Sequence, residues 1–290
     1  MLVLGASGML GHKFVQVAAR MLDVRAAIRQ PWPGLAEVLG VEAAAVVPHV
    51  DVTQDLGALL DAVRPGVVVN CAGALKPVSG TLDPAEAIAT NALAPHRLAS
   101  ASAARGIRLI HISTDCVFDG RRGHYAEDEV PNATDLYGRS KALGEVTTGT
   151  ALTIRTSIVG RQLQGARGLL EWFLTQRGRT VQGYHAMRFS GLTTTALSEA
   201  IVDVITRHPA LAGCIHIGGP AISKYDLLQL MNDTFRADVT IVGIDGPAVD
   251  RTLDGRRFAA LNGPAPSWRA MLSQAALDSA RYDGWRQRVS

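Results

Sequence analysis

The chain has 290 residues, 47% hydrophobic and 19% charged, so it can bury a sizeable core and is not a disordered protein. Its 29 basic and 26 acidic residues give a formal net charge of +3 without long runs of one sign, which argues against a nucleic-acid-binding protein. The three cysteines are too scattered for a disulfide framework or a metal site, and the absence of a signal peptide and of an apolar stretch of about 18 residues predicts a cytoplasmic protein outside the membrane.

Short apolar runs alternate with helical patterns in the first half of the chain. The runs cover residues 2–4, 24–28, 46–50, 67–71 and 107–112, and the helical patterns cover 9–20, 55–63 and 83–104. Strands that alternate with helices are typical of a parallel sheet, and continuous apolar strands indicate a sheet buried on both faces. We therefore expect an α/β fold with a Rossmann-type, doubly wound parallel sheet.

The second half continues this pattern and then departs from it. A helical pattern over 137–148 and an apolar run over 151–159 extend the sheet, and a helix over 196–207 and a run over 213–217 return to it. The other segments lack regular alternation. We expect a main domain and a smaller C-terminal one, made respectively of residues 1–160 plus 191–218 and of residues 161–190 plus 219–290.

A glycine-rich pattern, G-x-x-G-x-x-G, follows the first apolar run and opens the first helix. Glycines let the backbone turn sharply and let a pyrophosphate approach, and the helix N-terminus offers free N–H groups to it. The position of the pattern at the start of an α/β chain favours a bound dinucleotide over a turn without a ligand. The expected cofactor residues of this segment are Gly5, Ser7, Gly8, Met9, Leu10 and Gly11.

The residues after the second and third runs bear on the choice of dinucleotide. NAD-binding proteins usually place an acid near the end of the second strand, where it accepts hydrogen bonds from the ribose 2′-hydroxyl. This chain has Arg29 there, which would attract a 2′-phosphate and favours NADP(H) over NAD(H), unless it is an ordinary surface arginine. Asp51 and Val52 are expected beside the adenine, although aspartate is also common in turns for backbone reasons.

Tyr137 and Lys141 lie four residues apart, which puts both on one face of a helix. Hydride addition to a ketone leaves negative charge on the oxygen, and a proton must arrive there. A free tyrosine has a pKa near 10, and a lysine ammonium and an oxidised nicotinamide nearby would lower this pKa. A third hydrogen-bond donor is expected from Ser113, Thr114 or Asp115, at the end of the fifth strand. The pair could otherwise only decorate a surface helix.

Together these features resemble the extended short-chain dehydrogenases, and most closely the dTDP-4-dehydrorhamnose reductase family, also called the sugar-nucleotide-binding reductase family. The resemblance covers nearly the whole chain and is strongest over residues 1–160. The segments that carry it are GASGMLG (5–11), NCAG (70–73), ISTDCVFDG (112–120), YAEDEVPNATDLYGRSKALGE (125–145) and LTIRTSIVG (152–160).

The resemblance implies a catalytic triad of Thr114, Tyr137 and Lys141. Tyr137 and Lys141 would also contact the cofactor, and Thr114 and Tyr137 the substrate. The implied reaction is the NADPH-dependent reduction of the 4-keto group of a nucleoside-diphospho-4-keto-6-deoxysugar, in deoxysugar or polysaccharide biosynthesis. Members of the family are often dimers, so a homodimer is a further expectation. The main domain would bind NADP and the smaller domain the sugar nucleotide.

Further contacts are implied by the same resemblance. The loop that contains Cys71, Ala72 and Gly73 would pass along the cofactor, and Asn91 would help to hold the lysine through water. Arg155 would either meet the substrate or only stabilise the sixth strand. Lys76 would contact phosphates of one of the two ligands, or neither.

Cys116 is a departure from the family, whose members usually carry there a tyrosine that touches the sugar. GDP-fucose synthases, which are distant relatives, place an acid/base cysteine two residues after their catalytic serine, and Cys116 lies two residues after Thr114. A bifunctional epimerase and reductase that uses Cys116 is therefore an alternative to a simple reductase. His185 would be the partner acid of such an enzyme, or else an ordinary solvent or core histidine. A small buried filler is the other role open to Cys116. A non-catalytic NADP-binding regulatory protein is a third possibility, although such relatives typically lose the tyrosine or the lysine.

Overall fold

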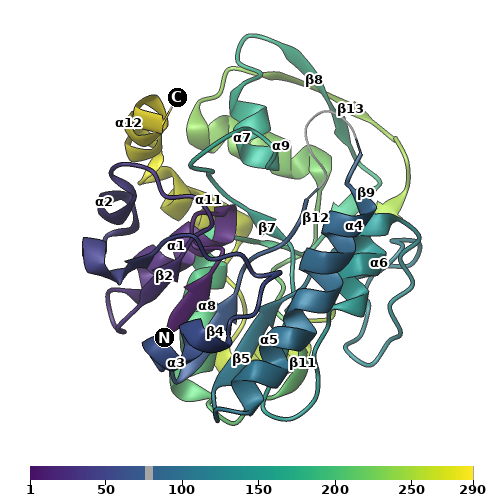
Figure 1. Cartoon of the computed structure of the whole chain (residues 1–290). Helices are drawn as coiled ribbons and strands as arrows, with labels where there is room; N and C mark the ends of the chain where they lie inside the picture. Colours follow the sequence, from purple (N-terminus) through teal and green to yellow (C-terminus); the bar gives the residue numbers. More distant parts are fainter. Residues whose placement is uncertain (76–80, 290) are drawn as a thin grey trace.

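A parallel sheet forms the centre of the computed structural model, which describes residues 1–75 and 81–289, with side chains described as far as Arg286 (Figure 1). Seven strands of the described chain form this sheet in the order β11-β6-β5-β4-β1-β2-β3, and every neighbouring pair is parallel. This confirms the predicted sheet. The strand order reverses between β1 and β4, where ligands bind outside the carboxyl ends of doubly wound sheets. The strands are β1 (Leu2–Leu4), β2 (Arg25–Ala27), β3 (Val46–Val47), β4 (Val67–Asn70), β5 (Arg108–Ile112), β6 (Leu152–Arg155) and β11 (Gly213–His216).

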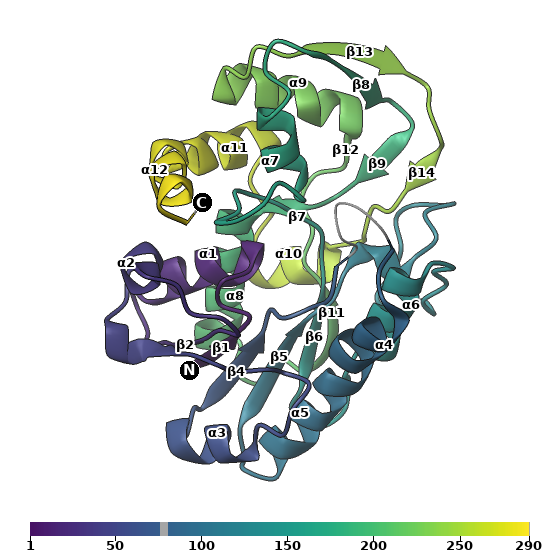
Figure 2. The same ribbon diagram turned by 45° about the horizontal axis from the view of Figure 1, so that its top comes forward.

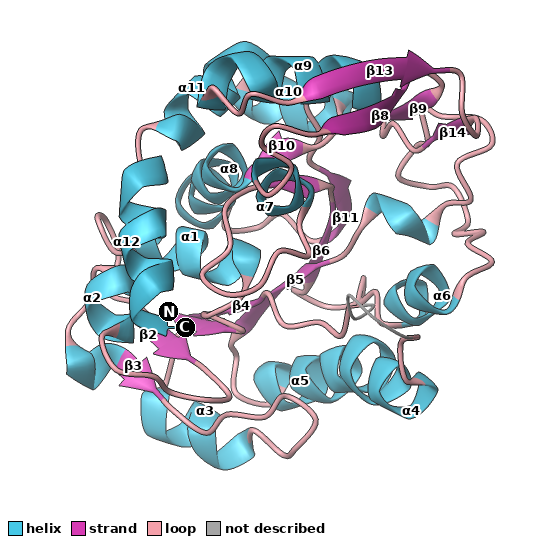
Figure 3. Cartoon of the chain, turned by 90° about the horizontal axis from the view of Figure 1, so that it is seen from above, coloured by secondary structure: helices cyan, strands magenta, loops and turns pink. Residues whose placement is uncertain are grey.

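Helices cover both faces of the sheet (Figure 3). Helices α1 (Met9–Ala18) and α8 (Thr194–Arg207) pack on one face, and α3 (Gly57–Val63) and α5 (Ala94–Ala103) pack on the other. Successive side chains of a strand point to opposite faces, so Val3 joins the core under α1 whereas its neighbours Leu2 and Leu4 join the core under α3. Burial on both faces explains why these strands read as continuous apolar runs.

Two predicted helices differ in detail from those observed. The helical pattern over 83–104 is divided into α4 (Pro84–Ala87), the π-helical η2 (Ile88–Leu93) and α5. The helix predicted over 137–148 is α6 (Leu136–Leu143), which ends at Gly144. Glycine is a poor helix former, and a Cβ at this position would lie only 1.8 Å from the backbone oxygen of Asn91.

A second group of elements lies above the carboxyl ends of the central strands (Figure 2). In this group β8 (Thr180–Tyr184) pairs with β13 (Thr240–Ile244), and β9 (Met187–Phe189) pairs with β12 (Ile222–Ser223) and β14 (Val249–Asp250). The largest hydrophobic core runs without a break from the central sheet into this group. The division into two domains therefore stays a prediction. The elements before β13 that have not yet been named are α2 (Leu35–Leu39), η1 (Ala43–Ala45), η3 (Asp115–Val117), β7 (Ile158–Val159), α7 (Leu169–Leu174), β10 (Leu192–Thr193) and α9 (Lys224–Phe235).

Three helices follow β14 in the chain, namely α10 (Arg256–Asn262), α11 (Trp268–Ala276) and α12 (Ser279–Val289). Helix α12 returns to α1, where the Tyr282 side chain is only 1% exposed. Helix α12 is thereby joined to the first helix of the chain by the hydrogen bond between Tyr282 and His12. No helix within the described ranges has both the length and the apolar character needed to cross a membrane.

Candidate active site

The glycine-rich loop passes from β1 into α1 in a tightly packed turn. Gly5 has φ +72°, and a Cβ on it would lie 2.8 Å from the backbone nitrogen of Ala72. A Cβ on Gly11 would lie 2.1 Å from the backbone oxygen of Gly5. Glycine at position 5 lets the glycine-rich loop approach the loop after β4, and glycine at position 11 lets α1 approach the glycine-rich loop. The result is a backbone cradle at the N-terminus of α1, which is suited to an anion.

A pocket of about 470 Å³ opens beside this cradle. It is lined by nine of the residues expected to bind the cofactor, namely Gly5, Ser7, Gly8, Arg29, Asp51, Val52, Cys71, Ala72 and Gly73. The other expected cofactor residues, Met9, Leu10, Gly11, Asn91, Tyr137 and Lys141, are not among those that line it, and Lys76 lies outside the described residues. The glycine cradle is suited to the pyrophosphate of a dinucleotide, and Arg29 and Asp51 in the same pocket are suited to its adenosine half, so we call it the dinucleotide pocket. The pocket also contains Arg167, which sequence analysis missed.

Asp51 has a local structural role in addition to its place in this pocket. Its carboxylate accepts hydrogen bonds from the backbone nitrogen of Thr53 at 2.9 Å and from the Thr53 hydroxyl at 2.8 Å. These bonds, together with the charge of Arg29, lower the pKa of Asp51. Arg29 and Asp51 therefore lie close enough to interact at the same end of the pocket.

Asn91 lies in the π-helical turn and is fully buried. Its amide accepts a hydrogen bond from the nitrogen of Ala74 at 2.8 Å and donates to the oxygen of Ala74 at 3.0 Å and to the hydroxyl of Ser140 at 3.1 Å. Asn91 thus joins the loop after β4 to helix α6, which carries the predicted catalytic pair of Tyr137 and Lys141. Interruptions of this kind in an α-helix are common at functional sites.

Helix α6 brings the predicted triad together. The Asp135 side chain caps it by accepting a hydrogen bond from Gly138 at 2.9 Å. A Cβ on Gly138 would lie 2.2 Å from the backbone oxygen of Cys116, so only glycine lets the helix lie against the segment after β5. The Tyr137 phenol then lies close enough to Thr114 to interact with it, and the buried Lys141 lies one turn further along.

Burial dominates the protonation of both residues of the pair. It raises the pKa of the Tyr137 phenol, and the neighbouring Cys116 adds to this shift while the interaction with Thr114 opposes it. Burial lowers the pKa of Lys141 to about 8, and Glu145 and Cys71 oppose this shift. In the chain by itself, burial therefore sets the pKa of Tyr137, and the lowering expected from Lys141 together with a bound nicotinamide stays a prediction. The ammonium donates to the backbone oxygen of Ile112 at 2.7 Å, and desolvation of the phenol outweighs other effects.

His111 is a neighbour of Lys141 that sequence analysis missed. Its Nε2 lies 3.4 Å from Lys141 Nζ, and its Nδ1 lies 3.2 Å from Asn70 Nδ2. The Asn70 side chain in turn accepts a hydrogen bond from Ala72 at 3.1 Å. A polar chain therefore connects the lysine to the cofactor loop. The available signal was the pairing of Asn70 with His111 across β4 and β5, which requires the strand register.

Arg155 takes part in a buried polar network below the catalytic segment. Its side chain donates two hydrogen bonds of 2.8 Å to the carboxylate of Glu145, which also accepts one of 2.7 Å from the Ser113 hydroxyl. The guanidinium lies 5.2 Å from the ring centre of Phe118. These contacts correspond to the stabilising role that was one of its two alternatives. Glu145 joins the end of α6 to the residue before Thr114.

Cys116 lies beside the triad, but its surroundings disfavour a thiolate. Burial raises the pKa of its thiol to about 12, and the charge of Asp115 acts in the same direction. The ring of His185 packs against that of Tyr225 within the second group of elements, with 4.2 Å between ring centres and 40° between the ring planes. The positive charges that reach Asp115 from that group belong to Lys224 and Arg251, which sequence analysis did not single out.

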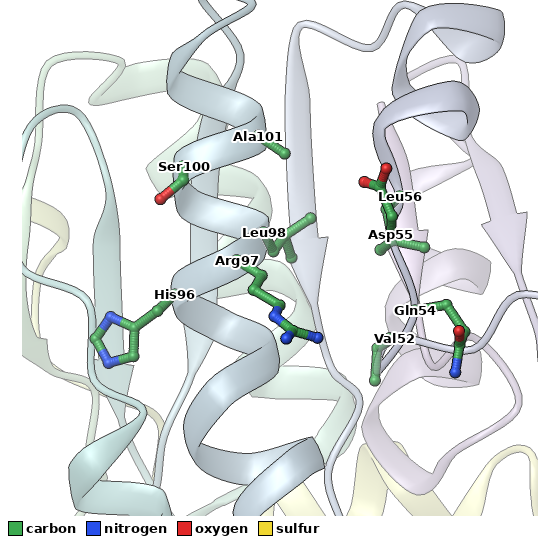
Figure 4. Close-up of a pocket in the computed structure, with 9 residues that line it drawn as sticks. All are labelled: Val52, Gln54, Asp55, Leu56, His96, Arg97, Leu98, Ser100 and Ala101. Carbon is green, nitrogen blue, oxygen red and sulfur yellow. The ribbon is translucent and has the colours of Figure 1, made fainter.

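A second pocket of about 470 Å³ lies between α5 and the segment before α3. Figure 4 shows Arg97 extending from α5 toward the segment that carries Gln54. This pocket shares Val52 with the dinucleotide pocket, and neither pocket is lined by a member of the triad. Within the described part of the chain, no three His, Cys, Asp or Glu side chains are grouped so that they could hold a metal ion.

The sequence and fold match known proteins over most of the chain. A probable dTDP-4,6-dihydroxy-2-methyloxan-3-one 4-ketoreductase of Streptomyces antibioticus is 32% identical over 98% of this chain and 88% of its own length. The β subunit of methionine adenosyltransferase 2 of Xenopus tropicalis is 40% identical over 30% of this chain and 26% of its own length. A Bacillus anthracis dTDP-4-dehydrorhamnose reductase, solved in complex with NADP, is 21% identical with a TM-score of 0.74, and the match covers 96% of this chain and 98% of that one. The family model described as the RmlD substrate binding domain matches residues 1–252, and the chain belongs to this family.

Proposed function

We propose that this oxidoreductase uses NADPH to reduce the 4-keto group of a nucleoside-diphospho-4-keto-6-deoxysugar. The observation that carries the proposal is the approach of Tyr137 to Thr114 after β5, with Lys141 close enough to Cys71 of the dinucleotide pocket to interact with it. The relative from Streptomyces antibioticus, whose name describes a 4-ketoreductase, supports the same reaction class.

The residues of the chain divide the chemistry between them. When bound, NADPH supplies a hydride to the carbonyl carbon. The Thr114 hydroxyl donates a hydrogen bond to the ketone oxygen, and the Tyr137 hydroxyl delivers the proton that completes the alcohol. The raised pKa of Tyr137 keeps this proton in place until negative charge develops on the substrate. Lys141 would hold the ribose next to the nicotinamide.

The choice of NADPH over NADH rests on Arg29. It lines the dinucleotide pocket at the end that also contains Asp51, where the adenosine half of a dinucleotide is expected. Its guanidinium would balance a 2′-phosphate, and no ion pair of Arg29 with an acid is present among the described residues.

The substrate would lie between the triad and the second group of elements, which we assign to the predicted substrate-binding domain. Lys224 and Arg251 carry positive charge from that group toward Asp115 and would suit an anionic sugar nucleotide. The predicted homodimer, the cytoplasmic location and the place in deoxysugar or polysaccharide biosynthesis stay predictions.

The test is a substrate screen. NADPH oxidation is followed by absorbance with a panel of dTDP-, UDP- and GDP-linked 4-keto-6-deoxysugars, and the product is identified by mass spectrometry and NMR. We expect one nucleotide series to consume NADPH and to yield the C4 alcohol. A protein that binds NADPH but oxidises it with no member of the panel would contradict the proposal and favour a regulatory role.

Epimerisation before reduction remains a second candidate, because the Cys116 thiol interacts with Tyr137. The reaction run in deuterium oxide would place deuterium next to the carbonyl if a proton is exchanged there. Loss of this label in Cys116→Ser, with reduction retained, would support the second activity. Absence of label in the wild-type product would rule it out.

A further inference from the structure

The loop of residues 161–168 contributes Arg167 to the lining of the dinucleotide pocket, although it lies far from the glycine loop in sequence. Arg167 lines the pocket, and its side chain is exposed. A Cβ on the adjacent Gly168 would lie 3.1 Å from the sulfur of Met9, the first residue of α1. Gly168 therefore lies against the side chain of the first residue of α1, and its neighbour Arg167 lines the same pocket as Gly5, Ser7 and Gly8.

Helix α12 holds this loop in position. Arg286 donates hydrogen bonds to the backbone oxygens of Gln162 at 3.0 Å and of Gly165 at 2.7 Å. The Gln162 side chain closes the loop by accepting a hydrogen bond of 2.6 Å from Gly168. At the start of the loop, the 4%-exposed Arg161 pairs with Asp283 of α12 at 2.7 Å.

The same helix reaches the glycine loop indirectly, through His12 of α1. His12 Nδ1 lies 2.7 Å from the oxygen of Gly8, which can only accept, so Nδ1 carries the proton. His12 Nε2 must then accept the hydrogen bond of 2.6 Å from the Tyr282 hydroxyl of α12. Both side chains are buried, and burial lowers the pKa of His12 to about 3, which keeps it neutral. Helix α12 therefore supports two segments that line one pocket.

From this geometry we infer that Arg167 binds the pyrophosphate of the dinucleotide and that helix α12 is the element that positions it. The inference rests on the proposed function for the class of cofactor. An arginine next to a helix N-terminus adds a full charge and directed N–H groups to the site that the backbone already offers an anion. The pyrophosphate is common to NADPH and NADH, whereas the 2′-phosphate assigned to Arg29 is present only in NADPH.

Binding titrations of the whole protein with NADPH and with NADH test the assignment without a substrate. For Arg167→Gln we expect the Kd of both dinucleotides to rise by the same factor, about tenfold for the loss of a charge-assisted contact. Arg269→Gln, an exposed arginine on α11, is the matched control and should leave both values unchanged. Equal affinities in wild type and Arg167→Gln, or a loss confined to NADPH, would overturn the assignment.

Two variants examine the role of α12 by the same titrations. Tyr282→Phe removes the hydrogen bond to His12, and Arg286→Gln removes the bonds to the 161–168 loop. Each should raise both Kd values about threefold, less than Arg167→Gln, with an unchanged circular dichroism spectrum at the assay temperature. Unchanged Kd values in both would refute the positioning role of α12. A wild-type protein that binds neither dinucleotide would overturn the proposed function itself.

Discussion

The residues around the predicted triad and the dinucleotide pocket lie at the same edge of the sheet. The polar side chains of the first region are buried and hydrogen bonded, whereas the arginines of the second are exposed. Around the predicted triad, the side chains of Thr114, Asp115 and Lys141 are at most 8% exposed, and each is hydrogen bonded within the protein. In the pocket Arg29 and Arg167 are exposed, and neither forms an ion pair with an acid of the described chain.

This difference predicts in which region a substitution can change function without changing the stability of the fold. When one partner of a buried polar pair is removed, the other stays in a medium of low polarity without a hydrogen bond, so both the reactivity of the site and the stability of the fold suffer. Exposed arginines at a pocket wall can be changed with little effect on the fold. Variants of the first region should therefore affect turnover or stability strongly, and variants of the second should affect ligand binding alone.

The largest effect is expected from Tyr137→Phe. This change removes the proton donor and keeps the ring, so kcat should fall on the order of 10²- to 10⁴-fold while the Kd of NADPH stays the same. Stopped-flow turnover and a binding titration measure the two quantities. Retention of more than half of the wild-type kcat would show that the proton comes from another group.

Arg155→Met comes next and affects stability. Glu145 would remain as a 7%-exposed carboxylate that has lost its partner, and breaking a buried pair in this way typically destabilises a protein by about 3 to 5 kcal/mol. Urea unfolding measures the change. The double variant Arg155→Met/Glu145→Gln should be less destabilised than Arg155→Met because no uncompensated charge remains. The opposite order would show that the pair matters mainly for packing.

The pH dependence of stability tests the buried lysine. Lys141 has a pKa of about 8 in the folded protein against the ordinary value of 10.5, so between these values the unfolded state binds more protons. The free energy of unfolding of wild type should therefore rise with pH across this window relative to Lys141→Met, by about 3 kcal/mol in total. Titrations of cysteine and tyrosine are shared by both proteins and cancel in the difference. Parallel curves would mean that the pKa of Lys141 is close to its ordinary value.

The smallest effect is expected from Arg29→Gln in the pocket wall. The Kd of NADPH should rise about tenfold, the Kd of NADH should stay the same, and the free energy of unfolding should change by less than about 0.5 kcal/mol. Isothermal titration calorimetry and urea unfolding measure these values. An equal loss for both dinucleotides would assign Arg29 to a part that they share.

Local patterns in the sequence were sufficient for much of the architecture. The apolar runs predicted the strands of the central sheet, because a strand buried on both faces needs an apolar side chain at nearly every position. The helix boundary was missed at Gly144, where a contact with Asn91 requires a glycine that a local pattern does not explain. Tyr137 and Lys141 could be paired in advance because residues four apart share a face of any helix.

The sequence by itself determined the alternation of strands and helices, the glycine cradle and the tyrosine–lysine pair, since each depends on residues within about one helical turn or one strand. Only the tertiary structure decided that His111 lies beside Lys141 and that Ser113, Glu145 and Arg155 form one network. It also decided that Arg167 lines the pocket, on a loop that is hydrogen bonded to α12. These neighbours come from separate segments of the chain, and their contacts depend on strand register and on how closely the helices pack.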